Sequence, residues 1–494
     1  MLDAISIAQT EYLLEKTEAS RKELGQYFTG SAIAKFMASL VIHSSSLEEI
    51  KILDAGSGFG ILAIAASLKC LEIGIKKVHV VIYEIDVELL AHLERNLKEV
   101  KAVFTEEQAS FSYEIFAQDF VLTRPDLFDN HFDLAIINPP YFKYNSKNSP
   151  YADVTSDLFK GNPNIYASFM GVASACLKPN GQMIAIVPRS FTNGLYFKGF
   201  RHYLNKNLNL NRLHIFHSRN QLFKELAVLQ ENIICSYIKA PQQEQVQVSA
   251  SEGYDDFDHL NFECYSSKMI IDQSNDQEII RIPEDREDAK IIEFIENLES
   301  SFEENQYFIS TGPVVEHRTQ EYIGYEELTP TVPLWRMHNI KCLQAVWTGG
   351  HKKDEYFKLK EGSEKHLTPN KSYFLLKRFS SKDEKRRLVG GVYIPNDNSP
   401  YLALENHVNY VGHKIDNLSK AEVFGLAVFF NSTLLDRYFR CLSGNTQVNA
   451  TEIRLIKMPS RHLIEQLGES FLELNQLNPS QEIIDKIISD ILKA

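Results

Sequence analysis

Short apolar runs alternate with helical patterns through the first half of the chain, and this alternation constrains the fold more than any other feature. The runs that have the character of buried strands are KILDAGSG, VHVVIYEID, FDLAIINPP, GQMIAIVPRS and LHIFHS. Between them, segments such as FGILAIAASLKCL and DVELLAHLERNLKEV repeat apolar residues at helical spacing. The pattern predicts an α/β fold, a doubly wound and mostly parallel sheet with helices on both faces.

The second half of the chain has a different character. A polar, strand-poor run, PQQEQVQ, follows Ala240 and predicts a domain boundary there, with domains at residues 1–240 and 241–494. Beyond it the pattern is irregular, with short strands, many turns and a helical C-terminus. This favours a second domain of the mixed α+β class.

Charge is distributed unevenly along the 494 residues, which carry a formal net charge of −13. Residues 241–310, which open the second predicted domain, carry 18 acidic and 4 basic residues and so account for the net negative charge of the chain. Residues 341–390 are instead rich in Lys and Arg, with tyrosines and phenylalanines interleaved. A local basic stripe with aromatic residues is typical of a polyanion-binding face, whatever the charge of the whole chain.

Several classes of protein are disfavoured. No apolar run approaches the roughly 18 residues of a membrane span, and the N-terminus lacks the pattern of a signal peptide. The six cysteines lie far apart without CxxC spacing, which indicates neither a disulfide framework nor a bound metal. We therefore expect a cytoplasmic, monomeric protein that contacts no membrane.

A glycine-rich loop, Asp54-Ala55-Gly56-Ser57-Gly58-Phe59-Gly60, follows the first strand and opens a helix. Alternate glycines allow a tight turn and the close approach of a ligand, although such a loop is about as often a structural turn. Acidic residues after the next two strands, Glu84 and Asp119, favour a nucleoside-type cofactor. Glu84, or the neighbouring Asp86, would bind a ribose diol, and Asp119 would bind an adenine amino group whose ring Phe120 covers. The GxGxG spacing favours S-adenosylmethionine, which has no pyrophosphate.

The tetrapeptide Asn138-Pro139-Pro140-Tyr141 follows directly on the strand that starts at Phe132. The Asn138 side-chain oxygen and the rigid Pro139 carbonyl are two acceptors for a planar group that bears an NH2, and Tyr141 offers a ring on which that group can stack. Asn-Pro and Pro-Pro are also common turn dipeptides. After the glycine loop and the two acids, a catalytic loop is the favoured interpretation.

These motifs resemble those of the S-adenosylmethionine-dependent N6-adenine DNA methyltransferases of type II restriction–modification systems, in the motif order called the gamma class. The resemblance covers roughly residues 20–235. It implies a Rossmann-like catalytic domain, a cofactor segment over residues 21–29 that contains Tyr27 and Thr29, and Phe191 as the ring closing the other face of a flipped adenine, where core packing is equally possible. It also implies double-stranded DNA as substrate and a cognate restriction endonuclease acting on the same sequence.

In the second half, the resemblance assigns target recognition to the C-terminal domain. The run LKRFSSKDEKRR is the expected phosphate-contacting element, and an amide-rich segment near residue 445 is a weaker candidate for backbone or base contacts. The residues expected at DNA are Lys377, Arg378, Lys382, Arg386, Arg387, Asn445 and Gln447.

Three alternatives remain open. A protein glutamine methyltransferase also uses an NPPY loop, but it would leave the C-terminal half without a task. A restriction enzyme with fused nuclease and methylase is disfavoured because the cofactor motifs begin near residue 21. N4-cytosine methylation is disfavoured because its usual loop begins with Ser where this chain has Asn138.

Overall fold

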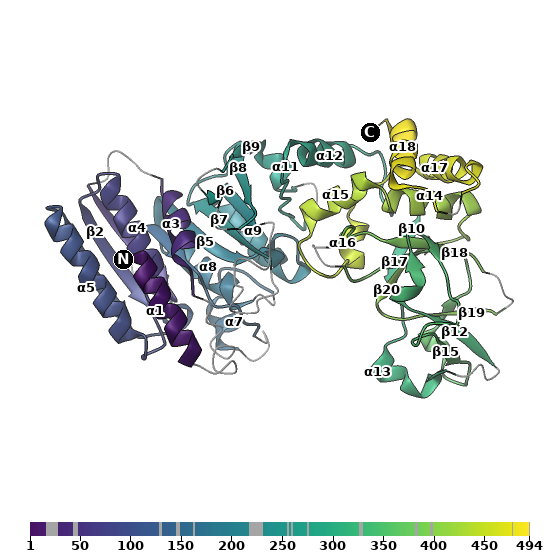
Figure 1. Ribbon diagram of the computed structural model, residues 1–494, viewed down its shortest axis with the longest axis horizontal. Coiled ribbons are helices and arrows are strands. Elements are labelled where there is room, and N and C mark those ends of the chain that lie inside the picture. The colour runs from purple at the N-terminus through teal and green to yellow at the C-terminus, as the bar shows by residue number, and fades with distance from the viewer. Residues whose placement is uncertain are drawn as a thin grey trace. The chain divides into compact units, whose positions relative to one another are not determined.

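The computed structural model divides the chain into two compact units, residues 1–285 and 286–494, coloured from purple to teal and from teal to yellow in Figure 1. The described residues are 1–15, 28–42, 48–127, 131–144, 149–161, 164–216, 231–253, 256–257, 260–273, 276–325, 330–380, 384–395, 399–476 and 478–493. The boundary lies at Asp285 and not at Ala240, because the two strands formed by residues 245–266 extend the first sheet. The acidic stretch 241–310 therefore spans the end of one unit and the start of the next.

A nine-stranded sheet forms the centre of the first unit, with the order β3-β2-β1-β4-β5-β7-β6-β8-β9. The strands β1 to β5 are mutually parallel, whereas β7 pairs antiparallel with both of its neighbours. This confirms the predicted α/β class. The strands are β1 (Glu49–Ala55), β2 (Lys77–Tyr83), β3 (Ser110–Phe116), β4 (Phe132–Ile137), β5 (Leu177–Pro188), β6 (Asn209–Phe216), β7 (Asn232–Ile238), β8 (Gln245–Ser251) and β9 (Glu263–Ser266).

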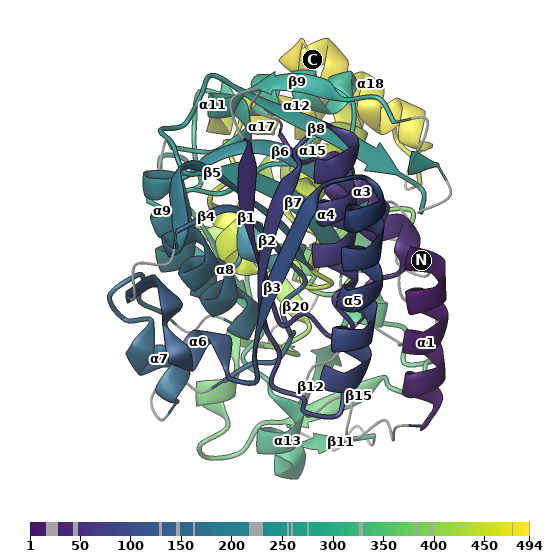
Figure 2. The same cartoon turned by 90° about the vertical axis from the view of Figure 1, so that its left-hand side faces the viewer.

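Helices cover both faces of this sheet, as the alternating pattern predicts (Figure 2). One face carries α3, α4 and α5, whose apolar residues join those of the strands in a single core. The other carries α8 and α9. The α-helices of the unit are α1 (Leu2–Glu15), α3 (Ser31–Ser39), α4 (Ile61–Glu72), α5 (Leu90–Glu106), α6 (Phe120–Thr123), α7 (Pro150–Val154), α8 (Ile165–Ala175), α9 (Lys198–Asn207) and α11 (Ser267–Ile270).

The carboxyl ends of β1, β2, β3 and β4 meet at one edge of the sheet because these strands are parallel. The glycine loop follows β1, Glu84 follows β2, Asp119 lies shortly beyond β3, and Asn138 follows β4. In open α/β sheets this edge is where ligands bind. The topology therefore gathers the predicted cofactor and catalytic residues in one place.

The second unit contains two sheets, with the orders β10-β20-β17-β18-β14-β13 and β11-β15-β12-β19-β16. Most of their neighbouring strands pair antiparallel, as expected for a mixed α+β domain. The strands are β10 (Tyr307–Thr311), β11 (Ile323–Gly324), β12 (Thr331–Trp335), β13 (Ile340–Lys341), β14 (Leu343–Ala345), β15 (Glu355–Lys358), β16 (Thr368–Pro369), β17 (Tyr373–Lys377), β18 (Gly390–Tyr393), β19 (Tyr401–Leu404) and β20 (Val408–His413).

Helices complete the second unit, mostly at its C-terminal end. They are α12 (Arg286–Glu296), α13 (Glu316–Thr319), α14 (Lys420–Phe430), α15 (Thr433–Leu442), α16 (Ala450–Arg454), α17 (Arg461–Glu473) and α18 (Gln481–Leu492). The apolar run 421–442 forms two helices because Ser432 caps the second, accepting a hydrogen bond from Leu435 N at 3.1 Å. Among the described residues, no helix is long and apolar enough to cross a membrane.

Candidate active site

The glycine loop turns sharply between β1 and α4. Gly56, Gly58 and Gly60 all have positive φ (+72°, +56° and +78°), a conformation that side chains disfavour. A Cβ on Gly58 would lie 2.9 Å from the ring of Phe28, so a side chain there would displace that ring. The loop thus needs glycine for its backbone and, at Gly58, for the close approach of a neighbouring aromatic.

Glu84 fastens the glycine loop to the end of β2. Its Oε2 accepts a hydrogen bond from Gly58 N at 2.6 Å, and its Oε1 accepts one from Asp86 N at 2.8 Å. Burial raises the pKa of Glu84, although the two backbone donors act in the opposite direction. Each carboxylate oxygen retains a second lone pair, so the residue can still accept from a ligand hydroxyl.

Asp54 lies behind the loop and does not line the cavity described below. Its Oδ2 accepts a hydrogen bond from Ala63 N at 3.1 Å, in the first turn of α4. Burial, helped by the negative charge of Glu84, raises the pKa of Asp54 to about 8. The structure therefore gives Asp54 a role at the helix N-terminus and not the direct cofactor contact that its motif position suggests.

Asp119 caps the short helix α6, its Oδ1 accepting from Leu122 N at 2.9 Å. Its Oδ2 accepts a hydrogen bond from the Tyr151 hydroxyl at 2.8 Å. Phe120 is 2% exposed and packs against Tyr83 and Phe169. The carboxylate and the ring thus lie side by side, as a site for an adenine requires.

A cavity opens at this edge of the sheet. Gly56, Gly58 and four further predicted cofactor residues line it, whereas Gly60 does not; the loop that begins at Asn138 also reaches it. It is lined by Gln9, Phe28, Thr29, Gly56, Ser57, Gly58, Ile61, Leu62, Tyr83, Glu84, Ile85, Gln118, Asp119, Phe120, Asn138, Pro140, Phe142, Tyr151, Ile165 and Phe169. The lining combines acidic acceptors with aromatic and aliphatic walls, which suits a nucleoside-containing ligand.

One polar atom of the cavity supports a bound ligand. Ser57 Oγ is buried and has no hydrogen-bond partner within the described part of the chain. A buried hydroxyl normally has a partner, so this atom is explained if a ligand supplies one. The residues present therefore fit a cofactor of the S-adenosylmethionine type.

Asn138 is held by two neighbours. Its Nδ2 donates to Thr29 Oγ1 at 3.0 Å, and its Oδ1 accepts from the Tyr141 hydroxyl at 2.7 Å. In this orientation the amide nitrogen faces Thr29 and the amide oxygen faces the Tyr141 hydroxyl. Thr29 lines the cavity, but its hydroxyl also orients the Asn138 side chain, a contact that sequence reasoning did not reveal.

The two aromatic residues expected at the substrate are more enclosed than predicted. Tyr141 is 8% exposed, and its hydroxyl also lies 3.0 Å from the carbonyl oxygen of Ile186. Phe191 is fully buried and packs edge-on against Phe200. Phe191 is therefore a core residue here and cannot cover a base as placed, whereas the ring of Tyr141 borders the catalytic loop without offering an open face.

Some lining residues were missed because their sequence carried no distinct signal. Tyr151 and Phe169 come from α7 and α8, beyond the catalytic loop, and contribute a hydroxyl and a ring. Tyr27 lies outside the described residues.

In the second unit, the structure brings the two segments predicted to bind DNA together. Phe379 and Gln447 form an antiparallel bridge, and Val448 N donates to the carbonyl of Arg378 at 2.7 Å. Lys377, Arg378 and Gln447 are each partly exposed. The bridge therefore places the two segments side by side, with these three side chains partly accessible.

Arg387 contradicts its predicted role. It is 1% exposed, and its guanidinium donates to Ser380 Oγ at 3.0 Å, to the carbonyl oxygen of Ser443 at 2.9 Å and to that of Asn445. Its cation also lies over the ring of Phe439. Arg387 therefore joins the two segments from inside and does not present a charge to DNA, because it is buried and each of its three side-chain nitrogens donates to the protein.

The remaining predicted contacts are mixed. Arg386 is partly exposed and bonds the Gln481 side chain, and Asn445 is partly exposed with its carbonyl on Arg387. Lys382 lies outside the described residues.

Comparison with known proteins extends these observations. Residues 4–223 match the family model described as Eco57I restriction-modification methylase. The chain is 35% identical over 484 residues to the type II methyltransferase M.BsuBI of Bacillus subtilis, covering 96% of this chain and 95% of that one. It is 32% identical to the type II methyltransferase M.PstI of Providencia stuartii, covering 96% and 94%.

A solved structure shows a similar fold at low identity. It is the type IIL restriction-modification enzyme MmeI in complex with DNA, with a TM-score of 0.58 and 12% identity over 96% of this chain and 77% of that one. The likeness supports the α/β arrangement described above.

Proposed function

Because the chain belongs to the family of type II restriction–modification methyltransferases, we propose that it transfers a methyl group from S-adenosylmethionine to N6 of an adenine within a specific double-stranded DNA sequence. The single observation that carries this proposal is the position of Asn138. Its oriented amide lies directly after β4 and lines the same cavity as Glu84 and Asp119. An acceptor for an amine and a nucleoside-binding site therefore share one wall.

The cavity residues divide the cofactor between them. When bound, S-adenosylmethionine supplies an activated methyl group on its sulfonium. Glu84 would accept from the ribose hydroxyls, Asp119 from the adenine amino group, and Phe120 would cover the ring. Ser57 Oγ would gain the partner that it lacks.

The chemistry of the catalytic loop is orientation. An adenine amine is a weak nucleophile because its lone pair is delocalised into the ring. Asn138 Oδ1 and the carbonyl oxygen of Pro139 would each accept one N–H of that amine, which favours a pyramidal nitrogen and leaves its lone pair free. Asn138 Oδ1 already accepts from Tyr141 but has a second lone pair. The N6–carbon bond would form as the bond from the methyl carbon to the sulfonium sulfur breaks, and the methylated amine would then lose one proton to solvent. No covalent intermediate on the enzyme is required.

The substrate must leave the DNA stack to reach these acceptors. Rotation of a nucleotide out of a duplex costs about a few kcal/mol, which stacking and backbone contacts offset. In this proposal the ring of Tyr141 turns from the Ile186 carbonyl to stack on the base. Phe191 plays no such part, because it is a core residue.

The second unit is proposed to read the DNA sequence. The partly exposed Lys377, Arg378 and Arg386 would neutralise phosphates, and the amides of Asn445 and Gln447 would contact the backbone or bases. The relative named for its complex with DNA has this fold over nearly the whole chain. Methylation would protect DNA from a cognate endonuclease of the same specificity, and we propose that the enzyme acts in the cytoplasm as a monomer.

The function can be tested by reading modified bases. The chain is expressed in a bacterial host that lacks its own adenine methyltransferases, and the genomic DNA is sequenced for N6-methyladenine and N4-methylcytosine. We expect N6-methyladenine at a single short sequence. Asn138→Ala should abolish the modification while binding of S-adenosylmethionine persists. Asn207→Ala, an exposed asparagine at the end of α9, is the matched control.

The outcomes separate the possible substrates. N4-methylcytosine would refute the choice of base. Methyl transfer to glutamine of a protein substrate, with unmodified DNA, would refute DNA as the substrate. Magnesium-dependent DNA cleavage by the purified chain would indicate a fused nuclease.

A further inference from the structure

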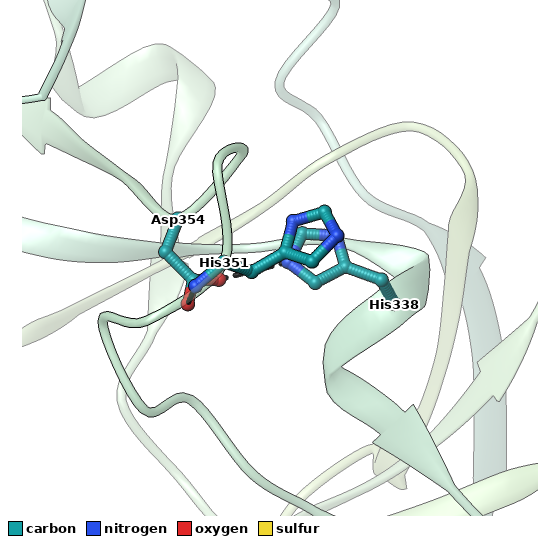
Figure 3. A group of neighbouring side chains, drawn as sticks. All are labelled: His338, His351 and Asp354. Atoms are coloured by element: carbon teal, nitrogen blue, oxygen red, sulfur yellow. Dashed lines mark hydrogen bonds and ion pairs between the residues drawn. The ribbon is translucent and has the colours of Figure 1, made fainter.

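A cluster of three side chains in the second unit precedes, along the chain, the segments that hold the predicted DNA-binding residues, although two of its members lie within the basic stretch 341–390. His338 comes from the turn 337–339 that precedes β13, and His351 and Asp354 come from the loop that precedes β15. One nitrogen of each imidazole and one oxygen of Asp354 lie within 4.8 Å of one another (Figure 3). The spacing of these residues along the chain gave no metal signal, because the fold brings them together.

We propose that His338, His351 and Asp354 form a binding site for a divalent transition-metal ion, with Zn²⁺ the best match to two nitrogens and one oxygen. Three protein ligands with an open fourth position are a common arrangement for this ion. The proposal is independent of the methyl-transfer function.

The geometry is close to that of a metal site. His338 Nε2 and Asp354 Oδ1 are 2.8 Å apart, and the two imidazole rings stack with centroids 4.0 Å apart. Ligand atoms around tetrahedral Zn²⁺ lie roughly 3.3 Å apart. His338 and Asp354 therefore need to separate slightly, and His351 needs to approach. His351 is exposed and follows Gly349, which has a φ of +69°, and Gly350, so its loop can make that adjustment.

The carboxylate is already oriented for this role. The Asp354 side chain is 1% exposed, its Oδ1 also accepts from Asn339 Nδ2 at 3.0 Å, and its Oδ2 accepts from His351 N at 2.8 Å. Hydrogen bonds of this kind position metal ligands in known sites. His351 Nδ1 accepts from Lys353 N at 3.1 Å, so a metal bound through Nδ1 would replace that bond and one bound through Nε2 would keep it.

Binding changes few bonds. The ion would replace the hydrogen bond between His338 Nε2 and Asp354 Oδ1, and the imidazole would bind as its neutral tautomer with the ring proton on Nδ1. Metal–nitrogen and metal–oxygen bonds form, and water completes the coordination. The result is a loop, residues 346–354, that is tied at its C-terminal end to the turn carrying His338.

Direct metal binding is the test. The full-length, untagged chain is treated with a chelator, dialysed and titrated with Co²⁺, whose visible absorption reports its coordination. We expect one Co²⁺ per chain, displaced by Zn²⁺. His351→Ala should weaken binding roughly 10-fold or more. His202→Ala, an exposed histidine paired with Glu278 in the first unit, should leave it unchanged.

A second measurement protects the test against misfolding. Lys352 and Lys353 are exposed trypsin sites within the loop. Zn²⁺ should slow cleavage there in the wild-type chain and not in His351→Ala, which removes only an exposed side chain. No Co²⁺ absorption in the wild-type chain, or the same affinity in His351→Ala and wild type, would overturn the proposal and leave a metal-free hydrogen-bonded cluster.

Discussion

The Thr29 hydroxyl contacts the amide of Asn138, which we propose is catalytic, and two substitutions can measure whether this contact orients the amide. Thr29→Val keeps the shape of the side chain and removes the acceptor that lies 3.0 Å from Asn138 Nδ2. Thr29 is only 4% exposed, so water cannot readily take the place of the hydroxyl. A buried donor left without its acceptor costs about 1–3 kcal/mol, which the amide can avoid by turning its NH2 toward the substrate amine. The rate of methyl transfer should then fall about 5- to 150-fold.

The assay is single-turnover transfer of a labelled methyl group to DNA, with cofactor and DNA both saturating. Thr29→Ser restores the hydroxyl and should stay within about 3-fold of wild type. Thr105→Val makes the same change on the exposed surface of α5 and should have no effect. Cofactor affinity, measured separately by calorimetry, distinguishes weaker cofactor binding from a misdirected amide. A Thr29→Val enzyme with wild-type rate, or a Thr29→Ser enzyme equally impaired, would refute the orienting role.

Three further changes test other parts of the molecule. Asp54→Asn should remove a pH dependence of stability: the folded chain holds a proton on Asp54 up to about pH 8, whereas the unfolded chain releases it near 3.8, so the free energy of unfolding falls by about 1.4 kcal/mol per pH unit across that window. Urea unfolding between pH 5 and 8 should show this slope in the wild type only, and parallel slopes would contradict the buried, protonated carboxyl. Replacing Lys377, Arg378 and Arg386 with Gln should reduce the dependence of log K on log salt by roughly 0.9 for each phosphate that is no longer neutralised, and an unchanged slope would place the DNA-binding face elsewhere. Arg387→Met should instead lower the free energy of unfolding by about 3 kcal/mol, because three buried acceptors lose their donor, and a fully stable variant would argue against its structural role.

The catalytic half of the molecule could be predicted well from the sequence. Parallel strands rich in Ile, Val and Leu are recognisable locally, and parallel pairing places the residues after each strand at one edge. Glu84, Asp119 and Asn138 therefore meet at the cavity as expected. This part of the fold follows from apolar runs that alternate with helical spacing along the chain, and these patterns can be recognised without comparing several sequences.

The predictions that failed concern the burial of single side chains and one long-range strand pairing. A basic run does not show which of its guanidiniums turns inward, so Arg387 was grouped with its exposed neighbours. The sequence around Phe191 does not show whether its ring faces the core or a substrate. The domain boundary at Ala240 was suggested by a polar run, but β8 and β9 add to the sheet edge beyond it, a long-range pairing that local polarity does not reveal.

The inward position of Arg387 has a consequence for attempts to change which sequence the enzyme modifies. Two contacts hold residues 377–380 against the segment 443–448. One is the set of hydrogen bonds from the Arg387 guanidinium, and the other is the bridge between Phe379 and Gln447. Replacing only one of these segments with that of a relative would disrupt the hydrogen bonds and the bridge that align the two segments. Under the proposed role of these segments in DNA recognition, a functional chimera must exchange both segments together with Arg387. The two segments then form one unit of exchange, although more than fifty residues of chain separate them.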